Sequence, residues 1–501
     1  MKLGELALKL RKREKADKAL SSSGALSFDL LYQLSFMSVI AAAGVPRSQI
    51  FSASAQTPCA TAEYFRKIEL ACRRLRYDYA KACRIVGETA KEEEMKGLLL
   101  RFSSSLMSGE PESDFLAREA EAQSEAYDNE YGRKLETLKL WTDAYVSLIL
   151  SSVLVIIIGI VSTMIWKIEM GFILGMTFVS IMTTAVGIWL IYLMSPREIM
   201  VLSWAGSREQ KLMRRMFRLL APLALIIAAP LLAKGANLGM VLLAVAALSF
   251  PIGFISMIDD KKINKRDSEV GAFLRILGGV CSAMGTTVRE ALGKLDLDAI
   301  NSLRREVKRL HTMFSTGIRG RLCWRKFIDE TGSELTNRSV GMFYEAIELG
   351  GEPEQAGYHA SLFASRVSRL RARRKTVSMP FQWLCIAMHT AIVALLIFIT
   401  EVIIIFGGMV EKAQTSMPNI SGAPSISSFT TFNFAGLELM HSMVLPLVVV
   451  FTVANALAPA IADGGSRYKI LYNLGITAAI SGLSLIFLPA MAGILFSSIE
   501  M

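Results

Sequence analysis

Two segments of this chain repeat each other, and each runs directly into an apolar stretch long enough to cross a membrane. The tetrapeptide Gly-Glu-Pro-Glu occurs at 109–112 and again 242 residues later at 351–354. Trp141, at the start of the first apolar stretch, is matched at the same offset by Trp383, and Gly44 lines up with Gly285 at an offset of 241. A repeat with a fixed period means that one supersecondary unit is used more than once. We therefore expect one helical module used twice, each time joined to a membrane bundle, which is typical of a scaffold.

Composition supports a membrane protein with basic parts outside the bilayer. The 501 residues are 52% hydrophobic and have a net charge of +11, with a mean hydropathy of +0.41. These values conflict for a soluble protein but agree for a polytopic membrane protein. The six cysteines form no Cys-x-x-Cys pair and no metal-like spacing, so we expect them to be reduced, small apolar side chains.

Seven apolar stretches are candidates for membrane spans, since a span takes about 20 apolar residues. They are 145–166, 170–194, 217–233, 238–258, 383–406, 439–461 and 471–496. The stretch 217–233 is shorter than the others and carries Pro222 and Pro230. It is the weakest candidate, but a tight turn at 234–237 pairs it with the next span.

Lysine and arginine in the short loops predict the orientation. The loop between the second and third spans carries five basic residues: Arg197, Arg208, Lys211, Arg214 and Arg215. The connections on the opposite side hold one lysine each. We therefore expect a protein of the cell membrane. With seven spans, the basic loops predict that the N-terminus and both modules are cytoplasmic, and that the loop 411–437 and the C-terminus lie outside the cell.

We therefore predict an all-α fold in five parts. These are a basic segment 1–27, module 1 at 28–140, spans at 141–258, module 2 at 259–379 and spans at 380–501. The apolar run 30–43 follows basic residues and imitates a signal peptide. Its repeat, 270–285, lies deep within the chain and contains Arg275, so we interpret both runs as the first buried helix of each module and expect no cleavage.

The repeated tetrapeptide predicts a turn between two helices. Gly109 and Gly351 tolerate the left-handed conformation that ends a helix. Pro111 and Pro353 then suit the first turn of the next helix, and Glu110 and Glu352 suit its positive end. A contact with a partner is the less favoured interpretation of these residues.

Motifs of enzyme chemistry are missing from the sequence. No Gly-x-x-x-x-Gly-Lys-Ser/Thr loop, His-Glu-x-x-His or Gly-x-Ser-x-Gly occurs, and the four histidines lack ligand spacing. We therefore expect no catalytic residue, no cofactor, no metal and no enzyme activity.

Charged and polar residues supply the candidate sites. Glu401 and His389 lie within the fifth span, where such groups are costly and are functional candidates. Basic clusters occur in module 1 (Arg66, Lys67, Arg73, Arg74, Arg76), in module 2 (Arg319, Arg321, Arg325, Lys326) and just before the fifth span (Arg366, Arg369, Arg371, Arg373, Arg374, Lys375). Anionic lipids account for the juxtamembrane cluster, and an acidic protein partner is the alternative for the module clusters. Nucleic acid is disfavoured because recognition motifs are missing.

Several of these stretches resemble a known family. The sequences LMSGEPESDFLAREAEA, IELGGEPEQAGYHASLF and WRKFIDETGSE, each module running into a membrane bundle, are similar to the type II secretion F family. The resemblance covers residues from about 28 to about 500, and the order of modules and spans resembles the archaeal branch, which serves archaella and type IV pili.

The resemblance implies a platform beneath a growing filament, either an archaellum or an adhesive pilus. A separate hexameric secretion ATPase would dock on the modules, and pilin or archaellin subunits would pass along the spans. The basic module clusters, above all the one in module 2, are the residues we expect to contact the ATPase, and we expect a homodimer. A transporter or channel is the alternative, although the clearest repeat lies in the modules and not in the spans.

Overall fold

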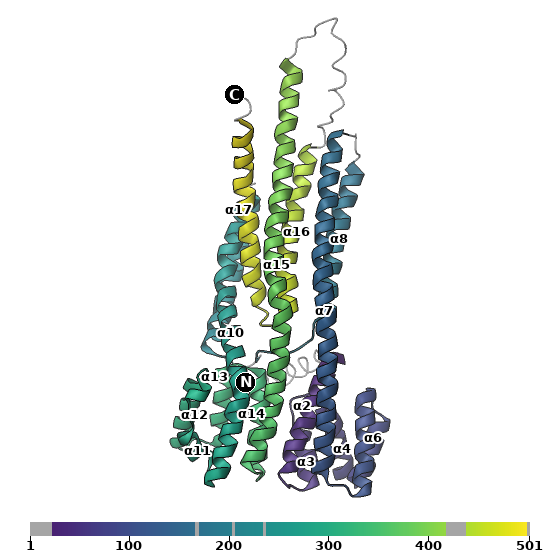
Figure 1. Ribbon diagram of the computed structural model, residues 1–501, viewed down its shortest axis with the longest axis vertical. Coiled ribbons are helices and arrows are strands. Elements are labelled where there is room, and N and C mark those ends of the chain that lie inside the picture. The colour runs from purple at the N-terminus through teal and green to yellow at the C-terminus, as the bar shows by residue number, and fades with distance from the viewer. Residues whose placement is uncertain (1–22, 166–169, 203–205, 234–236, 417–436, 498–501) are drawn as a thin grey trace, which may run out of the picture. The chain divides into compact units, whose positions relative to one another are not determined.

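A computed structural model describes residues 23–165, 170–202, 206–233, 237–416 and 437–497 of the chain (Figure 1). Three features expected from the sequence lie largely or wholly outside these ranges. The basic segment 1–27 is described only from residue 23 onward, and the turn at 234–237 only at residue 237. The loop 411–437 is described only at 411–416 and at 437.

The chain divides into two compact units, and each unit is built from three separate stretches. The first, which we call the module unit, comprises Met1–Arg133, Pro196–Arg208 and Lys261–Arg373. The second, the span unit, comprises Lys134–Ser195, Glu209–Asp260 and Arg374–Met501. Both predicted modules therefore contribute to a single unit, so the repeat is folded as a pair.

The module unit consists of two sets of short helices, each followed by a long one. The first set is α2 (Ser23–Ala42), α3 (Arg47–Ser54), α4 (Ala62–Leu75), α5 (Tyr79–Glu88) and α6 (Glu93–Ser108), followed by α7 (Glu112–Ile165). The second set is the later part of α10 (Leu238–Met284), then α11 (Val288–Lys294), η1 (Asp298–Ile300), α12 (Arg304–Ser315), α13 (Gly320–Thr331) and α14 (Glu334–Glu348), followed by α15 (Pro353–Ser416). The long helices α7, α10 and α15 continue without a break into the span unit.

Aromatic rings packed against one another form the core of each module. In module 1, Phe102 lies between Phe51 and Phe115, with ring centroids 5.4 and 5.0 Å away. In module 2, Trp324 packs edge-on against Phe327 at 5.9 Å and against Phe343 at 6.1 Å. Large aromatic side chains bury much apolar surface and favour such offset or edge-on contacts, so they account for the stability of helices too short to persist alone.

The left-handed residues of the backbone show the register of the repeat. Gly44 and Gly285 have φ of +68° and +56°, Gly109 and Gly350 have φ of +77° and +89°, and the two members of each pair are 241 residues apart. The turn residue equivalent to Gly109 is thus Gly350, one position before the glycine of the second tetrapeptide. The second module therefore gains its extra residue at this turn, which explains why the offset is 241 before it and 242 after it.

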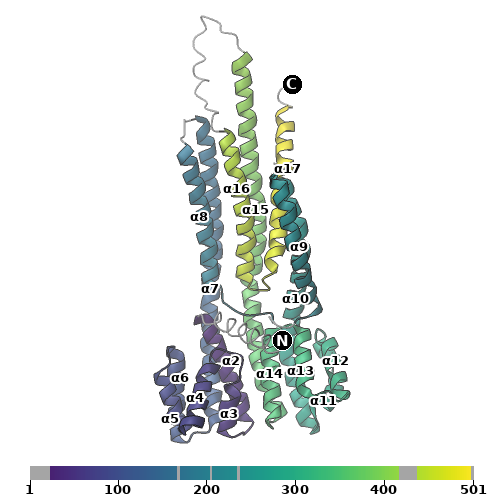
Figure 2. The same ribbon diagram turned by 180° about the vertical axis from the view of Figure 1, so that it is seen from behind.

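The span unit contains α8 (Met170–Met194), α9 (Arg208–Ala233), α16 (Leu437–Asp463) and α17 (Lys469–Ser497), together with parts of α7, α10 and α15 (Figure 2). Within the described residues, six helices are long and apolar enough to cross a membrane: α7, α8, α10, α15, α16 and α17. The predicted span 217–233 lies in α9, which is not among the six, and it stays a prediction.

Glycines allow α10 and α17 to approach closely. A Cβ atom added to Gly253 would collide with the backbone of Tyr472, and one added to Gly475 would lie 2.9 Å from the Cβ of Phe250. Small residues at helix crossings are the usual means of close packing in membranes, where the hydrophobic effect does not drive helices together.

Arg76 of module 1 lies at a position where module 2 has a glycine, and this difference predicts a stabilising substitution. Arg76 follows α4 with φ of +54°, and the position 241 residues later is Gly317, with φ of +77°. A side chain in this conformation costs about 1–2 kcal/mol, so Arg76→Gly should stabilise the protein by about 0.5–1 kcal/mol, part of the gain being lost to chain entropy. Gly317→Ala should destabilise it. Thermal unfolding of the solubilised full chain would measure both variants, and a shift of the unfolding temperature in the same direction and of the same size for the two would contradict strain at Arg76.

Candidate functional site

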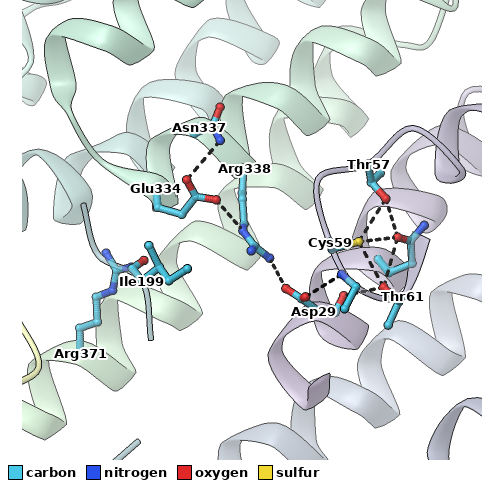
Figure 3. Close-up of polar contacts among 11 residues, drawn as sticks. Asp29, Thr57, Cys59, Thr61, Ile199, Glu334, Asn337, Arg338 and Arg371 are labelled. Atoms are coloured by element: carbon cyan, nitrogen blue, oxygen red, sulfur yellow. Dashed lines mark hydrogen bonds and ion pairs between the residues drawn. The ribbon is translucent and has the colours of Figure 1, made fainter. Parts of the chain in front are cut away.

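The two modules are joined by a buried arginine. Arg338 of α14 and Asp29 of α2 are 3% and 1% exposed, and the Arg338 Nη1 donates to Asp29 Oδ1 at 3.0 Å. The Nε of Arg338 donates to Glu334 Oε1 one turn earlier, also at 3.0 Å. Figure 3 shows the guanidinium between the two carboxylates. Because Asp29 belongs to module 1 and Arg338 to module 2, this charge pair connects segments 309 residues apart.

Aromatic rings complete the surroundings of this arginine. Its guanidinium carbon lies 4.8 Å from the ring centres of both Phe28 and Tyr32 on α2, an arrangement that favours a cation. Phe363 of α15 packs against the same two rings at 6.2 and 5.8 Å. Burial opposes the positive charge, but the carboxylates of Glu334 and Asp29 outweigh it and raise the pKa of Arg338 above its usual value. Arg338 is therefore charged at any physiological pH.

Asp29 is also bonded to the loop between α3 and α4. Its second oxygen accepts from the backbone N–H of Ala60 at 2.9 Å, so the carboxylate is satisfied on both sides. In the same loop the Cys59 thiol donates to Gln33 Oε1 at 2.9 Å and lies 3.1 Å from the Thr57 hydroxyl. Burial and then the nearby Asp29 charge raise the pKa of the Cys59 thiol, which makes it a polar packing group and a poor nucleophile.

The segment between α8 and α9 is held against module 2. We call residues 196–202, which follow α8 and precede α9, the strap. Val201 forms an isolated antiparallel bridge with Ser333. Leu202 N–H donates to the carbonyl of Gly332 at 3.2 Å, and Glu334 N–H donates to the carbonyl of Met200 at 3.1 Å. The strap therefore attaches at the start of α14, four residues before the arginine that holds module 1.

A second buried arginine secures the strap. Arg371 of α15 donates from Nε to Glu198 Oε1 and from Nη1 to Asp267 Oδ2, each at 2.5 Å. Arg371 is 7% exposed, Glu198 6% and Asp267 1%. Asp267 lies on α10 and accepts a further bond from Thr336 of α14 at 3.4 Å. Such a network links α10, α14, α15 and the strap, and removing one charge would leave the others buried and unpaired.

The structure thus divides the juxtamembrane cluster of basic residues. Arg371 points inward, as described, and Arg374 of the span unit donates to the carbonyl of Ala462 at 2.8 Å and to Ser195 Oγ at 2.5 Å. Arg366 is 23% exposed and pairs with Glu121 at 3.2 Å and with Asp128 at 3.5 Å. Arg373 and Lys375 also have partners, and Arg369 is exposed. Arg371 and Arg374 are therefore used inside the protein, which removes them from the surface available to lipid headgroups.

The module 1 cluster lies on α4 and the turn that follows it. Arg66, Lys67, Arg73 and Arg74 of α4 and Arg76 of the turn are exposed. Lys67 pairs with Glu63 at 3.0 Å and Arg73 with Glu69 at 2.6 Å, both one turn away. Such exposed pairs contribute little to stability.

The module 2 cluster lies on α13 and at its first turn. Arg319 is the residue before the helix, and it occupies the place of Asp78, which in module 1 caps α5 by accepting from the Ala80 N–H at 3.2 Å. An arginine at the positive end of a helix is electrostatically unfavourable. Arg321, Arg325 and Lys326 are exposed on the same helix. Because α13 repeats α5 and not α4, the two clusters occupy different places in the repeat.

The Gly-Glu-Pro-Glu stretches lie between helices in both modules. Gly109 ends α6, Pro111 precedes α7, and Glu110 pairs with Arg118. In module 2, Pro353 is the first residue of α15 and Glu352 accepts from Gln355 Nε2 at 2.8 Å. Gly351 is buried, and a Cβ atom there would lie 2.7 Å from the Cβ of Ala43, so this turn packs against the end of α2.

The two polar residues of the fifth predicted span differ in their surroundings. His389 is fully buried; its Nδ1 lies 3.2 Å from Asn455 Nδ2 and its Nε2 3.0 Å from Ser481 Oγ. Asn455 also accepts from the Tyr145 hydroxyl at 3.0 Å, so the network joins α7, α15, α16 and α17. Glu401 is partly exposed.

The residues that the sequence did not single out are the buried acids Asp29, Glu198 and Asp267 and the buried Arg338. A weak signal existed for Asp29, which directly precedes the apolar run 30–43. The six cysteines are all free. Within the described ranges, no three His, Cys, Asp or Glu side chains converge as metal ligands would.

The described helices define the class: an all-α, multi-pass membrane protein whose two repeated modules are paired through buried charges. No family model matches the chain, and no solved structure matches it.

Two curated proteins confirm the resemblance seen in the sequence. The chain is 22% identical over 418 residues to the Flagella accessory protein J of Methanocaldococcus jannaschii, covering 79% of this chain and 71% of that protein. It is 26% identical over 331 residues to the Flagella accessory protein J of Methanococcus voltae, covering 62% of this chain and 58% of that protein. The chain is thus a relative of these archaeal proteins.

Removing the buried arginine should separate the modules. Arg338→Met leaves Asp29 and Glu334 buried without their cation, so we expect a loss of about 3–5 kcal/mol in the free energy of unfolding. The matched control is Arg101→Met, because Arg101 pairs with Glu119 at 2.7 Å but is 58% exposed; its loss should be at most about 1 kcal/mol. Chemical unfolding of the solubilised full chain measures both, and equal losses would mean that the interface does not depend on Arg338.

Cysteines at the strap bridge should form a disulfide. Residues paired across an antiparallel bridge have Cα atoms about 4.5–5.5 Å apart, which suits a disulfide. Val201→Cys with Ser333→Cys should therefore cross-link under mild oxidation, as non-reducing peptide mapping would show. Val201→Cys alone is the control, since the six native cysteines should not replace the missing partner; an uncrosslinked double variant would place the strap elsewhere.

Proposed function

We propose that the chain is the integral membrane platform for assembly of an archaellum or a related type IV pilus-like filament. Its similarity to the Flagella accessory proteins J of two archaea carries the proposal. In this proposal the protein is not an enzyme. It couples a hexameric secretion ATPase, docked on the modules, to the extraction of pilin or archaellin subunits and the growth of the filament.

The paired modules suit that role physically. A motor can move a membrane protein only through a body that does not yield, and two modules joined by the buried charges of Arg338 and Asp29 resist separation. The exposed arginines of α4 and α13 offer cationic groups to an acidic partner. We place the modules in the cytoplasm and the C-terminus outside, in accord with the basic loops, and we expect the platform to act as a homodimer.

Loss of the gene tests the proposal directly. Negative-stain electron microscopy should show one class of surface filament absent from cells that lack the gene and restored when it is returned. An unchanged filament population would count against a platform and would favour a transporter, which solute flux in liposomes could then detect.

Charge reversal on α13 should prevent docking of the ATPase. Arg319→Glu, Arg321→Glu and Arg325→Glu together change the charge of the exposed face by six units, and like charges across an interface cost several kcal/mol. We expect co-purification of the ATPase to be lost while the protein still inserts. The control reverses three exposed cations elsewhere in module 2, Arg289, Arg305 and Lys308. If the ATPase still docks on the α13 variant, the three α13 arginines lie outside the interface.

A further inference from the structure

The first half of α9 presents a stripe of unpaired cations. Lys211, Arg215 and Arg218 are exposed, and their spacing of four and three residues places them on one face of the helix. In the part of the chain that the structure describes, Lys211 and Arg215 have no ion pair or hydrogen bond from their side chains, and Arg218 only donates to the carbonyl of Arg214, at 3.3 Å.

The same face becomes apolar in the second half of the helix. Leu219 is 66% exposed, Leu223 40% and Ile226 66%, and they lie about one, two and three turns beyond Arg215. Two prolines, Pro222 and Pro230, lie in this half. One continuous helix face therefore changes from basic to apolar within about two turns.

The other side of α9 is packed against the span unit. Met213 is 2% exposed, and the ring of Phe217 lies edge-on to Tyr468 near the start of α17 at 5.2 Å. The stripe thus has a fixed direction, away from the protein. Its acidic neighbour on the helix, Glu209, is partly buried and already has an interaction partner.

From this geometry we propose that Lys211, Arg215 and Arg218 form a binding site for the headgroup of an anionic phospholipid whose hydrocarbon chains lie along Leu219, Leu223 and Ile226. Exposed apolar side chains of a membrane protein face hydrocarbon, and cations directly beside them on the same helix face lie at the depth of the headgroups. Each cation at that depth attracts an anionic headgroup. The juxtamembrane arginines Arg371 and Arg374 do not compete for this role, since they are bonded inside the protein.

Charge alone is a weaker explanation of these residues. Basic residues in a loop set the orientation of a membrane protein by their number, which does not require them to share one face or to lack partners. A lipid site requires that the three cations share one face and that they lack partners within the protein. The proposed site does not depend on the platform function.

The test measures lipid binding by the solubilised full-length protein. Fluorescent phosphatidylglycerol is titrated against the wild type and against the variant Lys211→Gln, Arg215→Gln, Arg218→Gln, with phosphatidylcholine as the uncharged reference. We expect the wild type to prefer phosphatidylglycerol and the triple variant to bind it at least about tenfold more weakly, with phosphatidylcholine binding unchanged.

Two further variants make the result decisive. Lys211→Arg, Arg215→Lys, Arg218→Lys keeps the charges and should bind as the wild type does, which excludes misfolding as the cause of a loss. Arg289→Gln, Arg305→Gln, Lys308→Gln removes the same charge from module 2 and should also bind normally. Equal binding by the wild type and the α9 glutamine variant would overturn the proposal, and so would an equal loss in the module 2 variant.

Discussion

The pairing of the modules depends on one cation placed between two carboxylates. Arg338 is almost fully buried, and its charge is compensated by Asp29 from the other module, by Glu334 from its own helix and by two aromatic faces. A buried ion pair adds little to stability compared with apolar packing, but it is intolerant of any other arrangement, because separating the partners leaves each charge in a low-dielectric interior. The interaction therefore specifies which faces of the modules meet.

The same helix that holds module 1 also receives the strap. The strap bonds through Met200 and Leu202 to Glu334 and Gly332 at the start of α14. Glu334 thus contacts the strap through its backbone N–H and Arg338 through its side chain. A displacement of α14 would thus disturb the module interface and the segment between α8 and α9 together. Arg371 adds a second attachment from α15. For a protein whose modules are proposed to receive force, the strap is thus fixed to α14 and to α15 by buried contacts.

Much of the architecture could be predicted from the sequence because it is local or periodic. Apolar stretches of about 20 residues mark spans wherever they occur, and the repeated Gly-Glu-Pro-Glu turns revealed the modules. The interface could not be predicted, because Asp29 and Arg338 lie 309 residues apart and nothing local in the sequence pairs them. Arg371 and Arg374 have the sequence context of lipid-facing residues, and only the fold shows that they turn inward.

Comparison of the modules shows what the repeat retains and what it does not. Three left-handed turns, at Gly44, Arg76 and Gly109, recur 241 residues later, since a change of length there would displace whole helices. The charged contacts differ: Val270 occupies the position of Asp29, and Gly97 that of Arg338. A fully symmetric pair would need the Asp29–Arg338 contact twice, and the residues at the second location cannot form it. The two modules are thus alike in backbone but complementary in charge, so that each binds the other in a single way and presents a different surface to a partner.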